Sequence, residues 1–225
     1  MHILLNSTQY LTPSQRRIMN LRWAYWFVLC NLVIFWLLGL RYISGLHIHN
    51  AISMGYFLAT NFSHFFLLSL ISLVIPILVV FIIKNDFYYR LVVATYYTLL
   101  ISLLMLDQAV YNIFYEHLRW INLVDLLLAH ARYQVDFVNV YFIAIPFILL
   151  FEVLFSAYIW RRILHLHFRS KFTYIFFFLM LICICWSNSL YIYAMNTDNV
   201  DILKYRSVFP LMFYFTPDNG LDYLP

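Results

Sequence analysis

Five long apolar runs dominate this sequence, and each is long enough to cross a lipid bilayer. A transmembrane helix needs about 20 predominantly apolar residues to span a hydrocarbon core of roughly 30 Å. The runs occupy residues 23–44, 56–83, 91–112, 137–160 and 172–194. Only 11% of the 225 residues carry a charge, against roughly a quarter in soluble domains. The sequence therefore predicts an all-α membrane protein, a five-helix transmembrane bundle within residues 1–195.

The charges outside these runs are distributed unequally between the two sides of the membrane. One side holds nine basic residues and one loop acid, and the other holds five basic residues and seven acids. The nine are Arg16, Arg17, Arg22, Lys84, Arg90, Arg161, Arg162, Arg169 and Lys171. Short loops rich in Lys and Arg stay on the cytoplasmic side. We therefore expect a cytoplasmic N-terminus and a C-terminal tail on the outer side.

The connection between the third and fourth runs, residues 113–136, has a helical periodicity of its own. Its apolar positions at helical spacing are Leu118, Ile121, Val124, Leu127 and Leu128, with charged residues between them. We interpret the segment as an amphipathic helix lying on the outer membrane face. An ordinary loop helix packed against the bundle is the alternative.

Five polar side chains lie well inside the predicted helices, where polar groups are costly. Counting about 1.5 Å per residue from the helix ends gives their depths. The depths predict one polar layer of His64, Asp107 and Asn188 near the outer side, and another of Asn31 and Glu152 nearer the inner side. These layers either join helices by hydrogen bonds or belong to a proton or ion path. The sequence shows no continuous polar chain for such a path.

Motifs for metal binding and catalysis are not apparent in the sequence. The histidine pairs of HIH (47–49) and HLH (165–167) lack the i, i+4 spacing that places two imidazoles on one helical face. Cys30, Cys183 and Cys185 lie in apolar runs, where a disulfide framework is not expected. No Gly-rich phosphate loop or GxSxG is present. We expect no metal, no cofactor, no nucleic-acid partner and no catalytic activity of this chain.

The C-terminal tail, residues 196–225, combines cations with apolar aromatic residues. Its two cations precede the sequence VFPLMFYF. Such a combination at a membrane surface suits an amphiphile with a phosphate head and acyl chains. The predicted lipid-binding residues are Lys204, Arg206, Phe209, Leu211 and Phe213. A linker that merely dips into the membrane interface is the alternative.

Four stretches resemble the N-terminal membrane domain of the PbgA/YejM inner-membrane proteins of Gram-negative bacteria. They read WAYWFVLCNLVIFWLLGLRYI, LLMLDQAVYNIFYEHL, IAIPFILLFEVLFSAYIWRRI and YRSVFPL. Their spacing also fits, so the resemblance covers the whole chain. The family has the same residue types at the positions of Asn31, Arg41, His64, Asp107, Glu152 and Arg206.

The resemblance implies a five-helix membrane domain followed by a periplasmic domain with the sulfatase or alkaline-phosphatase fold. It also implies a role in lipopolysaccharide homeostasis, in which the protein senses lipid A at the outer face of the bacterial inner membrane. Through contact with LapB it would restrain the LapB/FtsH-dependent degradation of LpxC, the committed enzyme of lipid A synthesis. Cardiolipin is a second lipid that the resemblance suggests.

Two features depart from that family. The chain reaches only Pro225, so we expect the periplasmic domain to be absent, either through truncation or because this is a membrane-only form. Where the family's lipid A-binding segment carries an Arg pair, this sequence has Asp218 and Asn219. This departure weighs against the family's detailed contact with lipid A, although Lys204 and Arg206 would take part of it.

The sequence leaves three functions to compare. A non-enzymatic membrane regulator that binds a lipid on one side and a partner helix on the other is preferred. The alternative is the membrane domain of a lipid headgroup phosphotransferase, which keeps its metal ligands and Thr nucleophile in a sulfatase-like domain. A small transporter is disfavoured because inverted repeats and paired broken helices are not visible.

Overall fold

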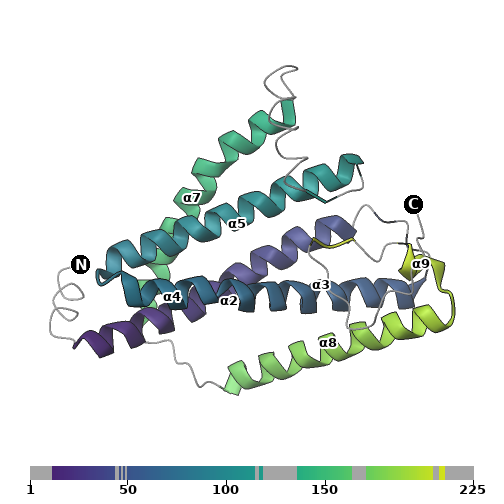
Figure 1. The fold of residues 1–225 in the computed structure, drawn as a ribbon, viewed down its shortest axis with the longest axis horizontal. Coiled ribbons are helices and arrows are strands. Elements are labelled where there is room, and N and C mark those ends of the chain that lie inside the picture. The colour runs from purple at the N-terminus through teal and green to yellow at the C-terminus, as the bar shows by residue number, and fades with distance from the viewer. Residues whose placement is uncertain are drawn as a thin grey trace.

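Long helices run back and forth between two ends of the computed structural model (Figure 1). The structure describes residues 12–43, 46, 48, 50–114, 117–118, 136–163, 171–204 and 208–210. The helices are α2 (Pro13–Ile43), α3 (Ala51–Ser72), α4 (Val74–Ile82), α5 (Asp86–Phe114), α7 (Asp136–Arg162), α8 (Lys171–Asn196) and the short α9 (Val200–Leu203). These residues contain no strand.

Five helical stretches in this part of the chain are long and apolar enough to cross a membrane, which confirms the predicted all-α transmembrane bundle. They are Pro13–Ile43, Ala51–Ile82, Asp86–Asn112, Ile143–Arg162 and Thr173–Asn196. The largest difference from the predicted runs is at α2, which begins at Pro13 instead of residue 23. The amphipathic helix predicted for 113–136 falls mostly outside the described residues.

The early start of α2 is fixed by a capping box. The backbone N–H of Gln15 donates to Thr12 Oγ1 at 3.3 Å, and the N–H of Thr12 donates to Gln15 Oε1 at 2.9 Å. Pro13 occupies the first helical position, where its missing N–H costs nothing. The polar first turns therefore extend α2 beyond the apolar run that defines its span.

The second span is divided at Leu73 into α3 and α4. Pro76 has no N–H to give to the carbonyl of Ser72, so the regular helix is interrupted one turn before the proline. Two tyrosines of α5 support the break: the hydroxyls of Ser72 and Tyr97 lie 2.7 Å apart, and the Tyr89 hydroxyl donates to the Pro76 carbonyl at 3.2 Å.

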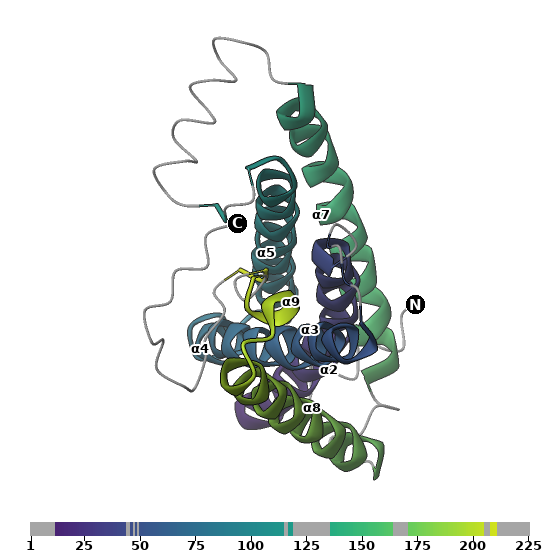
Figure 2. The same ribbon diagram turned by 90° about the vertical axis from the view of Figure 1, so that its right-hand side faces the viewer.

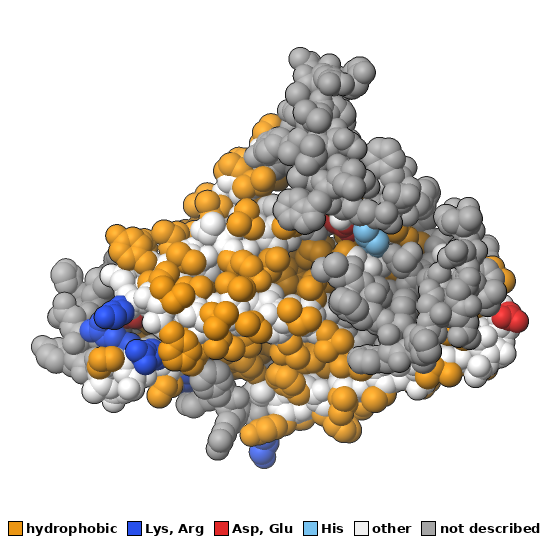
Figure 3. Space-filling model, viewed as in Figure 1, with side chains coloured by type: hydrophobic (Ala, Val, Ile, Leu, Met, Phe, Trp, Pro, Cys, Tyr) orange, Lys and Arg blue, Asp and Glu red, His pale blue; other side chains and the backbone are white. Residues whose placement is uncertain are grey.

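Helix α2 occupies the centre of the bundle. It packs against α3, α4, α5 and α7, while α7 lies mainly along α5 and α8 lies along α3. The end-on view shows α7 and α8 on different sides of the remaining helices (Figure 2). Apolar side chains cover much of the molecular surface (Figure 3), and the outward residues Phe147 of α7 and Phe178 of α8 are 69% and 62% exposed. In a bilayer these faces contact lipid chains.

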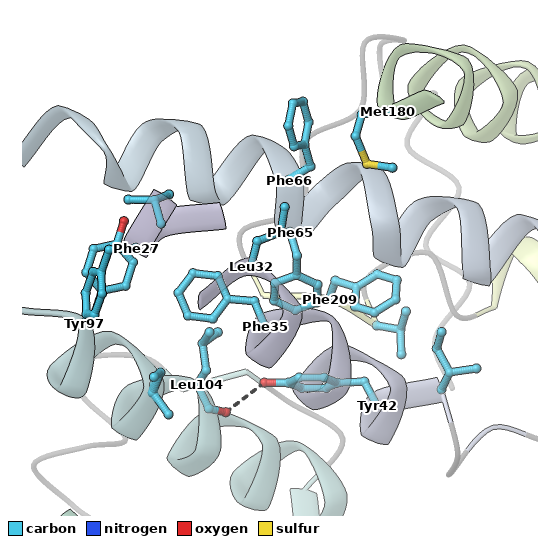
Figure 4. Packing of buried hydrophobic residues seen from close by; sticks show 14 of the residues in the cluster. Phe27, Leu32, Phe35, Tyr42, Phe65, Phe66, Tyr97, Leu104, Met180 and Phe209 are labelled. Atoms are coloured by element: carbon cyan, nitrogen blue, oxygen red, sulfur yellow. Dashed lines mark hydrogen bonds between the residues drawn. The ribbon is translucent and has the colours of Figure 1, made fainter. Parts of the chain in front are cut away.

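Aromatic rings fill the space between α2, α3 and α5 (Figure 4). The Tyr97 ring of α5 lies 5.5 Å from Phe27 and 6.2 Å from Phe35 of α2, measured between ring centroids. Phe35 also lies 6.5 Å from Phe65 of α3. All four rings are completely buried. Because such pairs prefer edge-to-face or offset geometry, they fix how neighbouring helices are rotated as well as how far apart they lie.

Helices α2 and α3 approach each other closely at Gly39. A Cβ atom at this position would overlap the side-chain oxygen of Asn61 and the ring of Phe65. Two hydrogen bonds at Trp36, one turn before Gly39, hold the helices together. Asn61 Nδ2 donates to the Trp36 carbonyl at 3.3 Å, and Trp36 Nε1 donates to the Phe62 carbonyl at 3.1 Å. Gly39 therefore sets the distance between the two helices.

Replacing Gly39 with Ala is expected to lower the free energy of unfolding by about 1–3 kcal/mol, because the added methyl group overpacks a full interface. Thermal unfolding in detergent would measure the change. Gly55→Ala in α3 is the matched control, since nothing lies within 4 Å of the Cβ added there. That control should raise stability by up to about 1 kcal/mol through helix propensity. An unchanged melting temperature for Gly39→Ala would contradict the close crossing.

Candidate functional site

Asp107, near the end of α5, is the centre of a buried group of hydrogen bonds. Its Oδ2 accepts from the Tyr42 hydroxyl at 2.7 Å and lies 2.9 Å from Nδ1 of His117. Its Oδ1 accepts from the backbone N–H of Leu118 at 2.6 Å. Asp107 is only 6% exposed, and charge-assisted hydrogen bonds offset the cost of burying its carboxylate. Asp107 thus joins the end of α2 to the residues that follow α5.

The beginning of the tail, residues 208–210, is inserted into the same end of the bundle. Phe209 is 1% exposed, and its ring lies 5.9 Å from His64 in a stacked arrangement and 6.3 Å from Tyr42. Nε2 of His64 lies 2.8 Å from the carbonyl oxygen of Pro210. Because a carbonyl can only accept, Nε2 carries the hydrogen in this pair. The tail is therefore fixed by both ring packing and a hydrogen bond.

Tyr42 connects these two groups of residues. Its hydroxyl reaches Asp107, and its ring lies 6.0 Å from His117 and 6.3 Å from Phe209. We call Tyr42, His64, Asp107, His117 and Phe209 the tail-end cluster. Its members come from α2, α3, α5, the segment after α5, and the tail. The cluster therefore ties five separate stretches of the chain together at one end of the bundle.

A second polar contact lies between α2 and α7, at a different depth. Asn31 Nδ2 donates to Glu152 Oε2 at 3.2 Å and to the Phe27 carbonyl at 3.1 Å. Both polar side chains are 0% exposed. One oxygen of each, Asn31 Oδ1 and Glu152 Oε1, has no hydrogen-bond partner in the described part of the chain. One turn further along α7, Trp23 Nε1 donates to the Ser156 carbonyl at 3.1 Å, so this helix pair is joined by successive hydrogen bonds.

The structure brings together most of the intramembrane polar residues that the sequence singled out. Asn31 meets Glu152, and His64 and Asp107 belong to one cluster, linked through Tyr42 and Phe209. Asn188 does not join them. Its Nδ2 donates to the Ile184 carbonyl of its own helix at 2.8 Å. Residues at the same depth meet only if both face the same interface, and depth alone does not give that direction.

The predicted lipid-binding residues are placed only in part. Lys204 is exposed immediately after α9, whereas Arg206, Leu211 and Phe213 lie outside the described residues. Phe209 was predicted to lie against acyl chains, but it is buried inside the bundle. The reason is that its ring packs against the rings of Tyr42, His64 and Phe65 at the end of the bundle. The ring therefore anchors the tail and is not available to a lipid chain.

Sequence reasoning missed Tyr42 and His117 as functional residues. A buried carboxylate needs donors, and this requirement alone indicated that Asp107 has partners. The requirement did not indicate which residues supply the donors. His117 belongs to the segment for which the sequence predicts an interfacial helix, so it was not considered as a partner of Asp107. Tyr42 is one of 19 tyrosines, and most tyrosines near the ends of spans serve as interfacial anchors.

The tail-end cluster and the Asn31–Glu152 contact hold segments of the chain in position. Across the described residues, no set of three or more His, Cys, Asp and Glu side chains is arranged to hold a metal ion. The tail-end cluster fixes the tail relative to three membrane helices. It also places a histidine and a buried carboxylate where movement of the tail would disturb them.

Membrane-spanning helices with buried polar contacts at two depths define a multi-pass α-helical membrane protein. Residues 11–221 match the family described as "Domain of unknown function (DUF3413)", and the chain belongs to this family. It is also similar to an uncharacterized protein of Haemophilus influenzae, with 28% identity over 219 residues. That alignment covers 95% of this chain and 36% of the relative, so the chain spans little more than a third of that protein's length.

The Asn31–Glu152 contact can be measured by a double-mutant cycle with Asn31→Leu and Glu152→Leu. Each single variant leaves a buried partner without its hydrogen bond, so the two losses should not add. We expect a coupling energy of about 0.6–2 kcal/mol, the range for hydrogen bonds between membrane helices. Unfolding in mixed micelles is the measurement. Additive effects of the two substitutions would show that the contact contributes nothing.

The anchoring of the tail can be tested by proteolysis after Lys204 and Arg206. His64→Leu removes the hydrogen bond to Pro210 and the stacking on Phe209, so trypsin should cleave the tail several-fold faster, because cleavage requires local opening. Asn188→Leu is the control, since the hydrogen bond of its side chain is to a carbonyl of its own helix. Equal cleavage rates in the His64 variant and the unaltered protein would contradict the anchoring.

Proposed function

We propose that this chain is the membrane domain of an inner-membrane regulator of lipopolysaccharide homeostasis. In this proposal it senses lipid A at the outer leaflet of that membrane. It restrains the LapB/FtsH-dependent degradation of LpxC through contact with a LapB-like membrane protein. The proposal is supported by the resemblance to the PbgA/YejM membrane domain and by the family match over residues 11–221.

The docking of residues 208–210 in the tail-end cluster is the observation that carries the proposal. Phe209 is fixed in the bundle, and Lys204 lies directly after α9, which packs against α8. Arg206 follows two residues further along the sequence. Ile192 and Tyr193 of α8 are 45% and 50% exposed at that end. A phosphorylated lipid suits this arrangement, because its headgroup can reach the cations while its chains lie on the apolar helix surface.

The tail-end cluster also supplies a route from the lipid to the helices. A lipid that binds better when the tail has moved would stabilise the moved state by its difference in affinity. Movement of Phe209 would disturb Tyr42 and His64, which belong to α2 and α3. The exposed apolar faces of α7 and α8 are the surfaces that we assign to a partner helix.

The orientation in the proposal follows from the charges at the two ends. The basic residues at the start of α2, the start of α5 and the end of α7 face the cytoplasm, and the tail is periplasmic. This arrangement follows the rule that cytoplasmic segments carry the Lys and Arg excess. It places the tail beside the leaflet in which lipid A is first exposed to the periplasm.

Binding of lipid A in nanodiscs tests the proposal. Replacing both Lys204 and Arg206 with Ala should weaken lipid A binding at least about tenfold, because each charge-assisted hydrogen bond contributes roughly that factor. Phosphatidylethanolamine is the lipid control and should be unaffected. In cells the same double variant should change the steady-state amount of LpxC, measured by immunoblot.

The matched protein control replaces Lys84 and Lys171, two cations at the opposite end of the bundle, with Ala. It removes the same charge and should leave lipid A binding unchanged. If both double variants reduce binding equally, the tail cations act only through net charge. If neither affects binding, lipid A recognition does not reside in this tail.

A further inference from the structure

The end of the bundle opposite the tail carries a concentration of basic side chains (Figure 3). The described ones are Arg16, Arg17, Arg22, Lys84, Arg90, Arg161, Arg162 and Lys171. Asp86 is the only acid at this end within the described ranges, and its Oδ1 accepts from Asn20 Nδ2 at 3.0 Å. None of these basic residues forms an ion pair within 4.0 Å of a described acid. One acid against eight basic residues leaves most of the positive charge at this end unbalanced within the described residues.

Three of the arginines have buried N–H groups without an acceptor in the described residues. They are Nε of Arg16, Nε and Nη2 of Arg22, and Nη1 of Arg90. Leaving a donor of a charged group buried and unpaired is costly, more so than for a neutral donor. The direction of the Arg90 guanidinium is also fixed, since its Cζ lies 4.1 Å from the ring centroid of Trp160.

The positions of Arg22 and Arg90 place them at the boundary of the hydrocarbon core. Each directly precedes an apolar run, 23–44 in α2 and 91–112 in α5. Trp160 is the last residue of the apolar run of α7, and the Arg90 guanidinium lies over its ring. Tryptophan is typical of this interfacial region, and the phosphate groups of lipids lie in the same region. The planar guanidinium presents paired N–H groups that match phosphate oxygens.

We propose that Arg22 and Arg90 bind the phosphate groups of anionic phospholipids in the leaflet at this end of the bundle. The lipid supplies acceptors for the unpaired N–H groups, while the remaining basic residues attract the anionic surface over a longer range. Inorganic phosphate offers the same acceptors, but a lipid is favoured because both arginines adjoin apolar runs. The site lies at the opposite end from the tail and does not depend on the function proposed above.

Native mass spectrometry of the purified full chain with phosphatidylglycerol tests this site. The combined variant Arg22→Gln/Arg90→Gln should bind phosphatidylglycerol at least about tenfold more weakly, because charge-assisted hydrogen bonds are lost. The control Arg17→Gln/Arg162→Gln removes the same charge from two exposed arginines whose guanidiniums lie over the rings of Phe81 and Tyr158. Its affinity should stay within about twofold of the unaltered protein.

Arg22→Lys/Arg90→Lys separates charge from geometry. It keeps the charge but lacks the paired N–H groups of the guanidinium, so its affinity should fall between those of the unaltered protein and the Gln variant. Full affinity in the Lys variant, or equal losses in the Gln variant and its control, would overturn the proposal. Competition by millimolar inorganic phosphate that removes the lipid completely would also overturn it, since the site would then serve the free anion.

Discussion

The packing of α2 against its neighbours is the interaction on which the rest of this bundle depends. In a membrane, helices gain little by hiding apolar surface from lipid, so close packing and hydrogen bonds decide which faces meet. Helix α2 contributes the fully buried rings of Trp23, Phe27 and Phe35 to that packing. It also holds the Asn31 contact to α7 and the Tyr42 contact to α5. By comparison, α7 and α8 each have one principal neighbour, and they leave most of their surface to lipid or to a partner.

The two buried polar groups differ in what they stabilise. The Asn31–Glu152 contact is a single hydrogen bond between two helices, and both residues retain an oxygen without a partner in the described structure. Its main effect is to fix the register of α7 on α2, since a shift of one turn would leave both polar groups in apolar surroundings. Asp107 instead accepts several hydrogen bonds at once, and two of them come from residues 117 and 118. The tail-end cluster thus fixes residues 117–118 and 208–210, which lie outside the membrane helices.

The sequence predicted the features that depend on composition and on depth in the membrane. It did not predict those that depend on the direction in which a side chain points from its helix. Apolar runs identified the five spans because hydrocarbon thickness fixes their length. The polar turns before Trp23 were missed, although Thr12 and Gln15 carry a capping signal that hydropathy does not register. Residue counting matched Asn31 with Glu152 but also included Asn188, which points along its own helix. Phe209 lies in the core and not against lipid as predicted, because composition does not distinguish a ring in the core from one at the membrane surface.

The two ends of the molecule are connected through the same pair of helices. Tyr42 of α2 and Asp107 of α5 meet at the tail end, while Trp23 of α2 and Tyr89 of α5, the neighbour of Arg90, lie 5.7 Å apart near the arginine-rich end. Helices packed through interlocked rings shift as rigid units between discrete arrangements. A ligand at either end can change their relative position only by the difference in its affinity for the two arrangements, about 1.4 kcal/mol for each tenfold ratio. A lipid headgroup that makes one or two additional charge-assisted hydrogen bonds in one arrangement supplies a difference of that size.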